Sequence, residues 1–119
     1  MEHARFIQHA GKDIFVLDFT NKKPDEALVL IDECARQVRS RPNGSVRTLT
    51  LVSGGTFSQD VLSGLKELTK GNAPHVCTAA LVGVTGLYKV ALQAVSLFSK
   101  RQFFMFDCKN EALDFLVQN

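Results

Sequence analysis

An almost uninterrupted apolar run at positions 75–82 constrains the fold of this chain more than any other feature. The segment reads His-Val-Cys-Thr-Ala-Ala-Leu-Val and lacks the polar–apolar alternation of a half-exposed strand. A strand of this composition is buried on both faces, which is typical of parallel sheets covered by helices. We therefore expect an interior sheet with helices packed on it.

The rest of the chain alternates between strand and helix patterns separated by short turns. Polar–apolar alternation at 5–9, a turn at 10–13 and a second strand at 14–19 predict an opening β-hairpin. Helical spacing of apolar residues, or strong β propensity, predicts the remaining elements. These are helices over 24–38 and 58–70, a strand over 46–52, a helix beginning at Thr85, a strand over 103–106 and a helix over 111–117.

This order predicts an α/β fold in which an N-terminal β-hairpin is followed by alternating helices and strands. We expect a mixed, mostly parallel five-stranded sheet with four helices, and the strand at 46–52 in a central position. Gly71 is expected to end the second helix, and Asp107 or Asn110 to cap the last one. Because the sequence contains no linker or repeat, we expect a single domain over residues 1–119.

Charge and hydropathy argue against two classes of protein. The formal net charge of +2 is too small for a nucleic-acid binder, which carries a strongly basic face. No apolar run reaches the roughly 18 residues of a membrane-spanning helix. The first residues also lack the basic and apolar regions of a secretory leader. We therefore expect a cytoplasmic protein with no transmembrane segment.

The cysteine and histidine residues predict neither a disulfide framework nor a metal site. Cys34, Cys77 and Cys108 are odd in number and far apart, which favours reduced thiols. The three histidines show no spacing typical of metal ligands. We expect no structural metal and no other cofactor.

Two strings, together with the order of elements, resemble a known group of proteins. They are Gly-Val-Thr-Gly-Leu at 83–87 and Phe-Asp-Cys-Lys-Asn-Glu-Ala-Leu at 106–113. The chain resembles the STAS superfamily, in its bacterial sporulation anti-sigma-factor-antagonist-like branch, which is also similar to lipid-binding CRAL-TRIO domains. The resemblance covers nearly the whole chain and implies a STAS-like fold. It also implies a regulatory module without enzymatic activity that binds a protein partner, a second copy of itself, or a small ligand.

The resemblance further implies candidate phosphorylation sites. Antagonists of this family are switched by phosphorylation of a serine at the start of the second long helix, in a pattern like Asp-Ser-Ser-Gly-Leu. The corresponding segment here is 57–62, where Gln59 or Asp60 occupies the phosphoacceptor position. A shift of one or two residues places Ser58 or Thr56 there instead, so these two residues are the candidate phosphoacceptors.

The loops after the strands at 46–52 and 75–82 supply a candidate ligand site. Parallel neighbouring strands would place both loops at the edge where open α/β folds bind ligands. Free N–H groups at helix N-termini attract phosphate or carboxylate, so a small anionic ligand could bind there. The candidate residues are Ser53, Gly54, Gly55, Thr56, Ser58, Thr85 and Gly86. Alternatively, these residues only form tight turns and helix caps, since neither loop completes a nucleotide-binding fingerprint.

Acid–base candidates are present but are not linked by spacing. His75 and Cys77 lie two residues apart on one strand, and Asp107 is a third candidate from a distant segment. Asp18 interrupts an apolar strand, where its carboxylate either satisfies a neighbouring loop or contacts a ligand.

Phenylalanines suggest one further possibility, a lipid pocket. Phe98 and Phe104 either fill the core or line a gap beneath the helix that begins at Thr85, where an acyl chain could bind. Our leading hypothesis is a non-enzymatic protein-interaction module. A small-ligand or lipid carrier comes second and an enzyme third.

Overall fold

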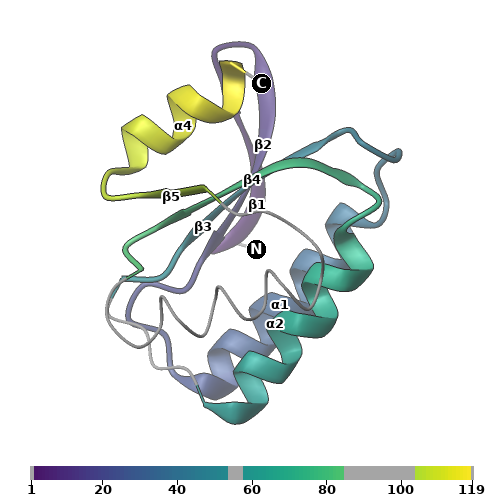
Figure 1. Ribbon diagram of the computed structural model, residues 1–119. Coiled ribbons are helices and arrows are strands. Elements are labelled where there is room, and N and C mark those ends of the chain that lie inside the picture. Colours follow the sequence, from purple (N-terminus) through teal and green to yellow (C-terminus); the bar gives the residue numbers. More distant parts are fainter. Residues whose placement is uncertain (1, 54–57, 85–103, 119) are drawn as a thin grey trace.

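The fold is taken from a computed structural model that describes residues 2–53, 58–84 and 104–118. Its strands are β1 (Ala4–His9), β2 (Lys12–Asp18), β3 (Val46–Leu51), β4 (Val76–Val82) and β5 (Phe104–Phe106). They form one five-stranded sheet in the order β1-β2-β3-β4-β5 (Figure 1). Only the β1–β2 pair is antiparallel. The predicted mixed, mostly parallel sheet with a central β3 is therefore confirmed.

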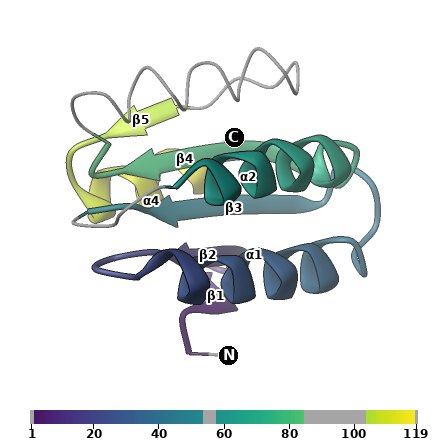
Figure 2. The ribbon, with the colours of Figure 1, turned by 90° about the horizontal axis from the view of Figure 1, so that it is seen from below.

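Helices cover both faces of this sheet. The described helices are α1 (Pro24–Val38), α2 (Gln59–Asn72) and α4 (Lys109–Gln118). α1 and α2 lie side by side on one face, and α4 lies on the other (Figures 1 and 2). The sequence predicts four helices, whereas the described residues contain three. The remaining one, expected from Thr85, falls on residues 85–103 and lies outside the described residues.

The start of α1 follows from local chemistry. Pro24 occupies the first turn, where its missing N–H group costs nothing. The Glu26 carboxylate accepts a hydrogen bond from the Lys23 amide at 3.1 Å. Acidic residues in this turn also suit the positive end of the helix dipole. The buried face of the helix consists of Ala27, Leu30, Ile31, Cys34 and Val38.

The hairpin turn is shorter than the sequence prediction. Ala10 and Gly11 have φ values of 51° and 79°, and they alone separate the two strands. Consecutive left-handed residues match the twist of a two-residue hairpin. Lys12 consequently already pairs with His9 in the sheet, so the predicted turn at 10–13 is wrong by two residues.

The expectation that Gly71 ends the second helix is wrong. α2 continues to Asn72, and Ala73 forms its C-cap. A Cβ atom at Gly71 would overlap the guanidinium group of Arg39, whose Nε donates to Asn72 Oδ1 at 2.9 Å. The glycine therefore makes room for a side chain from α1.

The last helix begins earlier than the sequence predicts. α4 starts at Lys109, which places Asn110 inside the first turn instead of at the cap. The Ala112 amide donates to the Cys108 carbonyl oxygen at 3.2 Å, so the first helical hydrogen bond includes Cys108. Asp107 lies one residue further upstream.

Each face of the sheet carries its own buried cluster. The cluster beneath α1 and α2 includes Phe15, Leu17, Phe19, Leu65, Ala79 and Leu81. The cluster beneath α4 consists of Ile14, Val16, Leu49, Ala80, Val82, Ala112, Leu113 and Leu116. β2 and β4 contribute alternate residues to the two clusters, which confirms the prediction that the 75–82 strand is buried on both faces.

Cys77 is the exception in β4. Val46 pairs with Val76, while the next β3 residue, Arg47, pairs with Thr78. Cys77 is therefore an extra residue at a β-bulge, and its side chain is exposed. Because of the bulge, Val76 faces the same cluster as Ala79.

Candidate functional site

The loops that follow β3 and β4 begin side by side, as predicted. The Val52 amide donates to the Val82 carbonyl oxygen at 3.0 Å, which aligns the ends of the two strands. The Ser53 carbonyl oxygen then accepts from the Asn21 amide at 3.1 Å, which ties the loop after β2 to the same edge. This edge is where parallel α/β sheets bind ligands.

Ser53 and Gly83 are in direct contact at this edge. Gly83 has a φ of 85°, and a Cβ atom there would overlap Ser53 Oγ. Glycine is therefore required both for the backbone conformation and for the space that it leaves. This contact packs two strand ends together, which agrees with the alternative interpretation of these residues as turn formers.

Ser58 lies at the N-terminus of α2 and caps it. Its Oγ accepts a hydrogen bond from the Val61 amide at 3.2 Å. The side chain is half-buried, and the helix dipole makes this end favourable for negative charge. Ser53 and Ser58 are thus the two predicted site residues that the structure describes. The other candidates, Gly54, Gly55, Thr56, Thr85 and Gly86, lie outside the described residues.

Asp18 satisfies a neighbouring loop. Its Oδ1 accepts from the Thr20 amide at 2.9 Å, and its Oδ2 lies 3.9 Å from His3 Nδ1. Of the two roles that the sequence allows for this carboxylate, the structure supports the loop contact.

The acid–base candidates do not converge. His75 immediately precedes β4, and its Nδ1 donates to the Arg41 carbonyl oxygen at 2.8 Å. Asp107 follows β5, which runs parallel to β4, so it lies at the opposite edge of the sheet. Cys77 points outward from the bulge. Among the described residues, no group of three or more His, Cys, Asp or Glu side chains could hold a metal ion.

Among the described residues, two groups have shifted pKa values, and structural contacts explain both. Burial raises the pKa of the Cys34 thiol to about 12, against a smaller opposing effect of its hydrogen bond from Asn72. The pKa of Glu33 is lowered, mainly because Gln37 and then Arg36 donate hydrogen bonds to its carboxylate. Neither group shows the pairing expected of a nucleophile and its base.

A groove runs between α1 and α2 on the side away from the sheet, and we call it the outer groove. It is lined by Leu28, Ile31, Asp32, Ala35, Arg39, Gly64, Glu67 and Leu68. Gly64 lets the helices approach, since a Cβ atom there would lie 3.3 Å from Ile31 Cδ1. Leu28 is 36% exposed and Val29, its neighbour outside the groove, is 52% exposed. The outer groove therefore has an apolar floor open to a partner.

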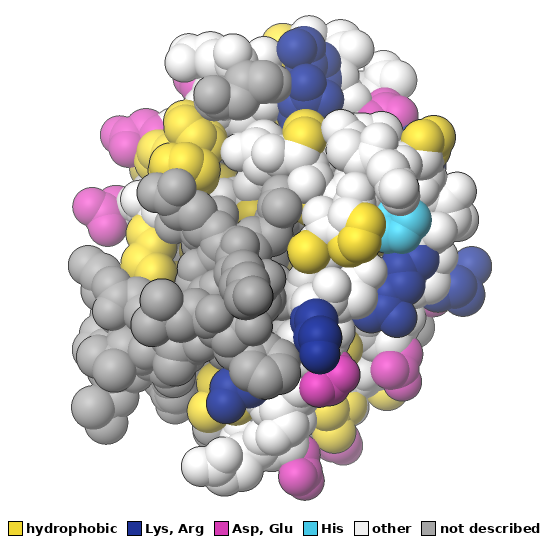
Figure 3. All heavy atoms as spheres, turned by 45° about the vertical axis from the view of Figure 1, so that its right-hand side comes forward, with side chains coloured by type: hydrophobic (Ala, Val, Ile, Leu, Met, Phe, Trp, Pro, Cys, Tyr) yellow, Lys and Arg dark blue, Asp and Glu magenta, His cyan; other side chains and the backbone are white. Residues whose placement is uncertain are grey.

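Neither sign of charge dominates the molecular face that is drawn in Figure 3. Figure 3 shows acidic and basic side chains intermixed on the face in view. A continuous basic stripe is typical of proteins that bind a nucleic-acid backbone. The face in Figure 3 does not have that character.

A second space, which we call the inner cavity, lies between the sheet and the helix pair. Its volume is about 60 Å³, and its walls come from β2, β3, β4, α1 and α2. Phe19 and Val52 lie at the end near the carboxyl edge, and Cys34 and Asn72 lie in the helix wall. Sequence reasoning missed this cavity because it treated Thr48 and Thr50 only as strand formers.

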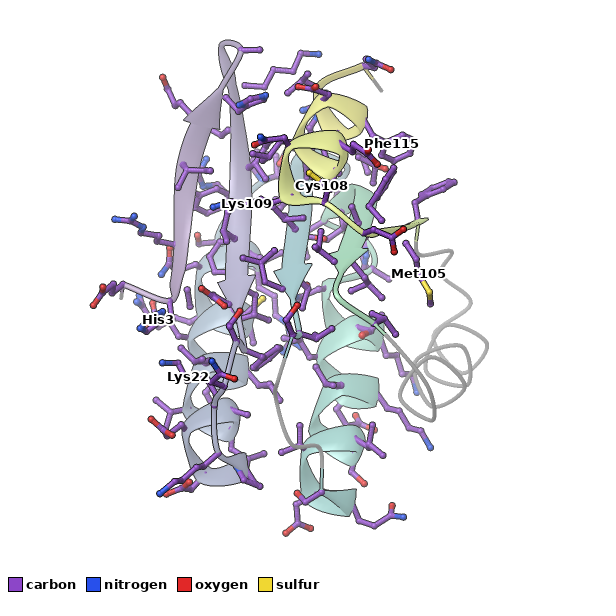
Figure 4. The ribbon with its side chains drawn as sticks, turned by 90° about the vertical axis from the view of Figure 1, so that its left-hand side faces the viewer. His3, Lys22, Met105, Cys108, Lys109 and Phe115 are labelled. Atoms are coloured by element: carbon purple, nitrogen blue, oxygen red, sulfur yellow. The ribbon has the colours of Figure 1, made fainter. Side chains whose placement is uncertain are left out.

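Aromatic residues gather around β5, on the face opposite α1 and α2. Phe104 and Phe106 pack against Phe115 of α4, with ring centroids 4.7 and 5.2 Å apart. Met105 points to the other face of β5, where it packs on the first cluster (Figure 4). Phe104 therefore faces α4, while Phe98 lies outside the described residues.

Comparison with known proteins gives no match to any family, to any curated protein or to any solved structure. Within the described part of the chain, no helix has the length and apolar character needed to span a membrane.

Proposed function

We propose that this chain is a non-enzymatic, STAS-like regulatory module that binds a protein partner through the outer groove. The groove is the observation that carries this proposal. Leu28 and Ile31 give it an apolar floor, while the exposed carboxylates of Asp32 and Glu67 stand on its rim. An apolar centre with a polar rim is the usual composition of a protein interface.

The charged groups that line the outer groove are the carboxylates of Asp32 and Glu67 and the guanidinium group of Arg39, whose Nε already donates to Asn72 Oδ1. Asp32 and Glu67 form no ion pair with any other described residue. A segment that places an apolar side chain on Leu28 and a lysine or arginine beside these carboxylates would complement the groove. Such rim pairs accelerate association and weaken as salt rises.

Phosphorylation of Ser58 would regulate this contact. α1 and α2 both follow parallel strands, so both helices begin at the same edge of the sheet. Ser58 precedes Gly64 by six residues, which is about 9 Å along the helix axis. A phosphate on Ser58 would suit the positive end of the α2 dipole and add negative charge at one end of the groove. Phosphorylation should therefore tighten the binding of a basic partner.

Affinity capture from a cell extract, followed by quantitative mass spectrometry, tests this proposal. Leu28→Glu places a charge on the groove floor, and it should reduce capture of the groove partner at least about tenfold. Val29→Glu is the matched control, because Val29 is more exposed and lies outside the groove. Ser58→Asp keeps a good helix cap while adding charge, so it should increase capture.

Equal capture by the wild-type protein and by Leu28→Glu would contradict the proposal. Circular dichroism of both glutamate variants checks that each one is folded. Sedimentation velocity over a range of concentrations identifies the case in which the partner is a second copy. In that case, self-association of the wild-type chain should be lost in Leu28→Glu and kept in Val29→Glu.

A further inference from the structure

The inner face of β3 is more accessible than the strands on either side of it. Thr48 and Thr50 are half-buried although β3 is the central strand and lies beneath the helix pair. Their partners in the flanking strands are at most 4% exposed, namely Phe15, Leu17, Ala79 and Leu81. Both threonines line the inner cavity.

The two hydroxyl groups have no hydrogen-bond partner among the described residues. Other polar groups in the cavity wall are satisfied: Thr69 Oγ1 donates to the Leu65 carbonyl oxygen at 2.6 Å, and Asn72 accepts from Arg39 at 2.9 Å. A hydroxyl that faces an apolar space without a partner is unfavourable, and valine would fill the same position without that cost. Residues two apart on one strand face are about 7 Å apart, so both hydroxyls can reach one small molecule.

The cavity also limits the charge and the size of its occupant. Among the described residues, no charged side chain lines it, so an ion there would have no counter-charge in the cavity wall. Its volume of about 60 Å³ exceeds the space needed by one water molecule. One water needs roughly 15 Å³, whereas a cavity of roughly 150 Å³ accepts benzene. A compact molecule of about four non-hydrogen atoms fits between these limits.

The geometry points to a binding site in the inner cavity for a short-chain, uncharged ketone, aldehyde or alcohol held by the hydroxyl groups of Thr48 and Thr50. The apolar carbons of such a molecule would contact Leu65 and Leu81, which line the same space. A hydroxyl group both donates and accepts, so a carbonyl or a hydroxyl oxygen on the ligand is equally suited. This site shares one lining residue, Leu68, with the outer groove, and it does not depend on the proposed function.

Titrations followed by nuclear magnetic resonance test this inference with three probes of nearly the same planar shape. Acetone carries a carbonyl oxygen, isobutene has a methylene group in its place, and acetate carries a charge. We expect acetone to shift the signals of Thr48, Thr50 and Leu65 in a saturable way. Isobutene should bind about tenfold more weakly, since it makes no hydrogen bond, and acetate should cause no saturable shift at these residues.

Matched variants link the binding to the two hydroxyl groups. The double variant Thr48→Val, Thr50→Val keeps the shape of the strand and should weaken acetone binding about tenfold. Thr78→Val is the control, because Thr78 is also a buried threonine but does not line the inner cavity. It should leave acetone binding unchanged.

A third variant keeps the test decisive if the double variant does not fold. Ala79→Val adds two methyl groups to the cavity wall and should abolish the saturable shifts. The inference is overturned if acetone causes no saturable shift at the cavity residues, which would mean that the cavity holds only water. It is also overturned if the double valine variant binds acetone as tightly as the wild-type protein does.

Discussion

Cys34 illustrates how a single residue reports on its surroundings. It lies on the buried face of α1 and in the wall of the inner cavity, where Asn72 Nδ2 donates to its sulfur at 3.6 Å. The weak hydrogen bond does not compensate for the loss of water around a thiolate. The pKa of the thiol therefore rises to about 12, and the side chain behaves as a small apolar group.

This pKa predicts a loss of stability at alkaline pH. The folded protein holds the thiol proton up to about pH 12, whereas the unfolded chain releases it near the ordinary thiol pKa of 9.0. Stability from this group is complete below pH 9 and falls as the pH rises toward 12. Between pH 8 and pH 10, this thiol alone should lower the free energy of unfolding by about 1.4 kcal/mol.

Urea unfolding at the two pH values measures this effect. From pH 8 to pH 10, the free energy of unfolding of Cys34→Ala should fall by about 1.4 kcal/mol less than that of the wild-type protein. Cys77→Ala, which removes an exposed thiol, is the control variant. If Cys34→Ala lost as much stability as the wild type, the raised pKa would be wrong.

At the scale of elements, buried Asn72 joins α2 to α1 through two polar contacts. The Arg39 side chain crosses Gly71 and donates to Asn72, which is 6% exposed. Asn72 is also bonded through its amide to Cys34 and through its carbonyl oxygen to the His75 amide. The last turn of α2 is therefore fixed to α1 and to the start of β4.

Substitution of Gly71 by alanine has two opposing effects on stability, one through helix propensity and one through the hydrogen bond from Arg39 to Asn72. By propensity alone, Gly71→Ala should stabilise α2 by about 1 kcal/mol. Because the new methyl group would displace Arg39 and leave buried Asn72 without its donor, we expect a net loss of about 1 kcal/mol instead. Chemical unfolding of the single and double variants measures the coupling. In an Arg39→Ala background, Gly71→Ala should be stabilising. If Gly71→Ala raised the free energy of unfolding in both backgrounds, the hydrogen bond between Arg39 and Asn72 would be unimportant for stability.

At the scale of the whole molecule, the sheet is stabilised by two separate clusters. α4 closes the second one and is joined to the rest of the chain by distant contacts. Arg47 Nε donates to the Leu116 carbonyl oxygen at 3.0 Å, and His9 Nε2 lies 3.2 Å from Asp114 Oδ1 at the hairpin end. The C-terminal helix therefore covers strands from the first half of the chain.

A truncation in this second cluster tests its contribution. Leu116 is fully buried, so Leu116→Ala should lower the free energy of unfolding by about 2–4 kcal/mol. Leu28→Ala removes the same atoms from an exposed position and should cost less than about 1 kcal/mol. Thermal and urea unfolding measure both. A cost below 1 kcal/mol at Leu116 would mean that α4 is not part of the cooperative unit.

Prediction from sequence succeeded where the signal is periodic. The central strand, the two-sided burial of β4 and the buried face of α1 all follow from patterns within one segment. At the candidate site, only the adjacency of the loops after β3 and β4 and the cap by Ser58 were predictable, because both depend on strand order and local capping rules. The inner cavity was not predictable from the sequence, since Thr48 and Thr50 are typical strand residues and only the packing of α1 and α2 on the sheet creates the cavity.

The order of elements and the α/β class follow from hydrophobic periodicity, because this pattern is set by residues a few positions apart. The roles of Gly71 and Gly83 depend instead on packing between distant elements. Each glycine accommodates a side chain from another element, Arg39 in one case and Ser53 in the other. The outer groove and the inner cavity arise in the same way, from the distance at which α1 and α2 pack against each other and against the sheet. No local pattern encodes that distance, because it depends on the volumes of side chains brought together from distant parts of the chain.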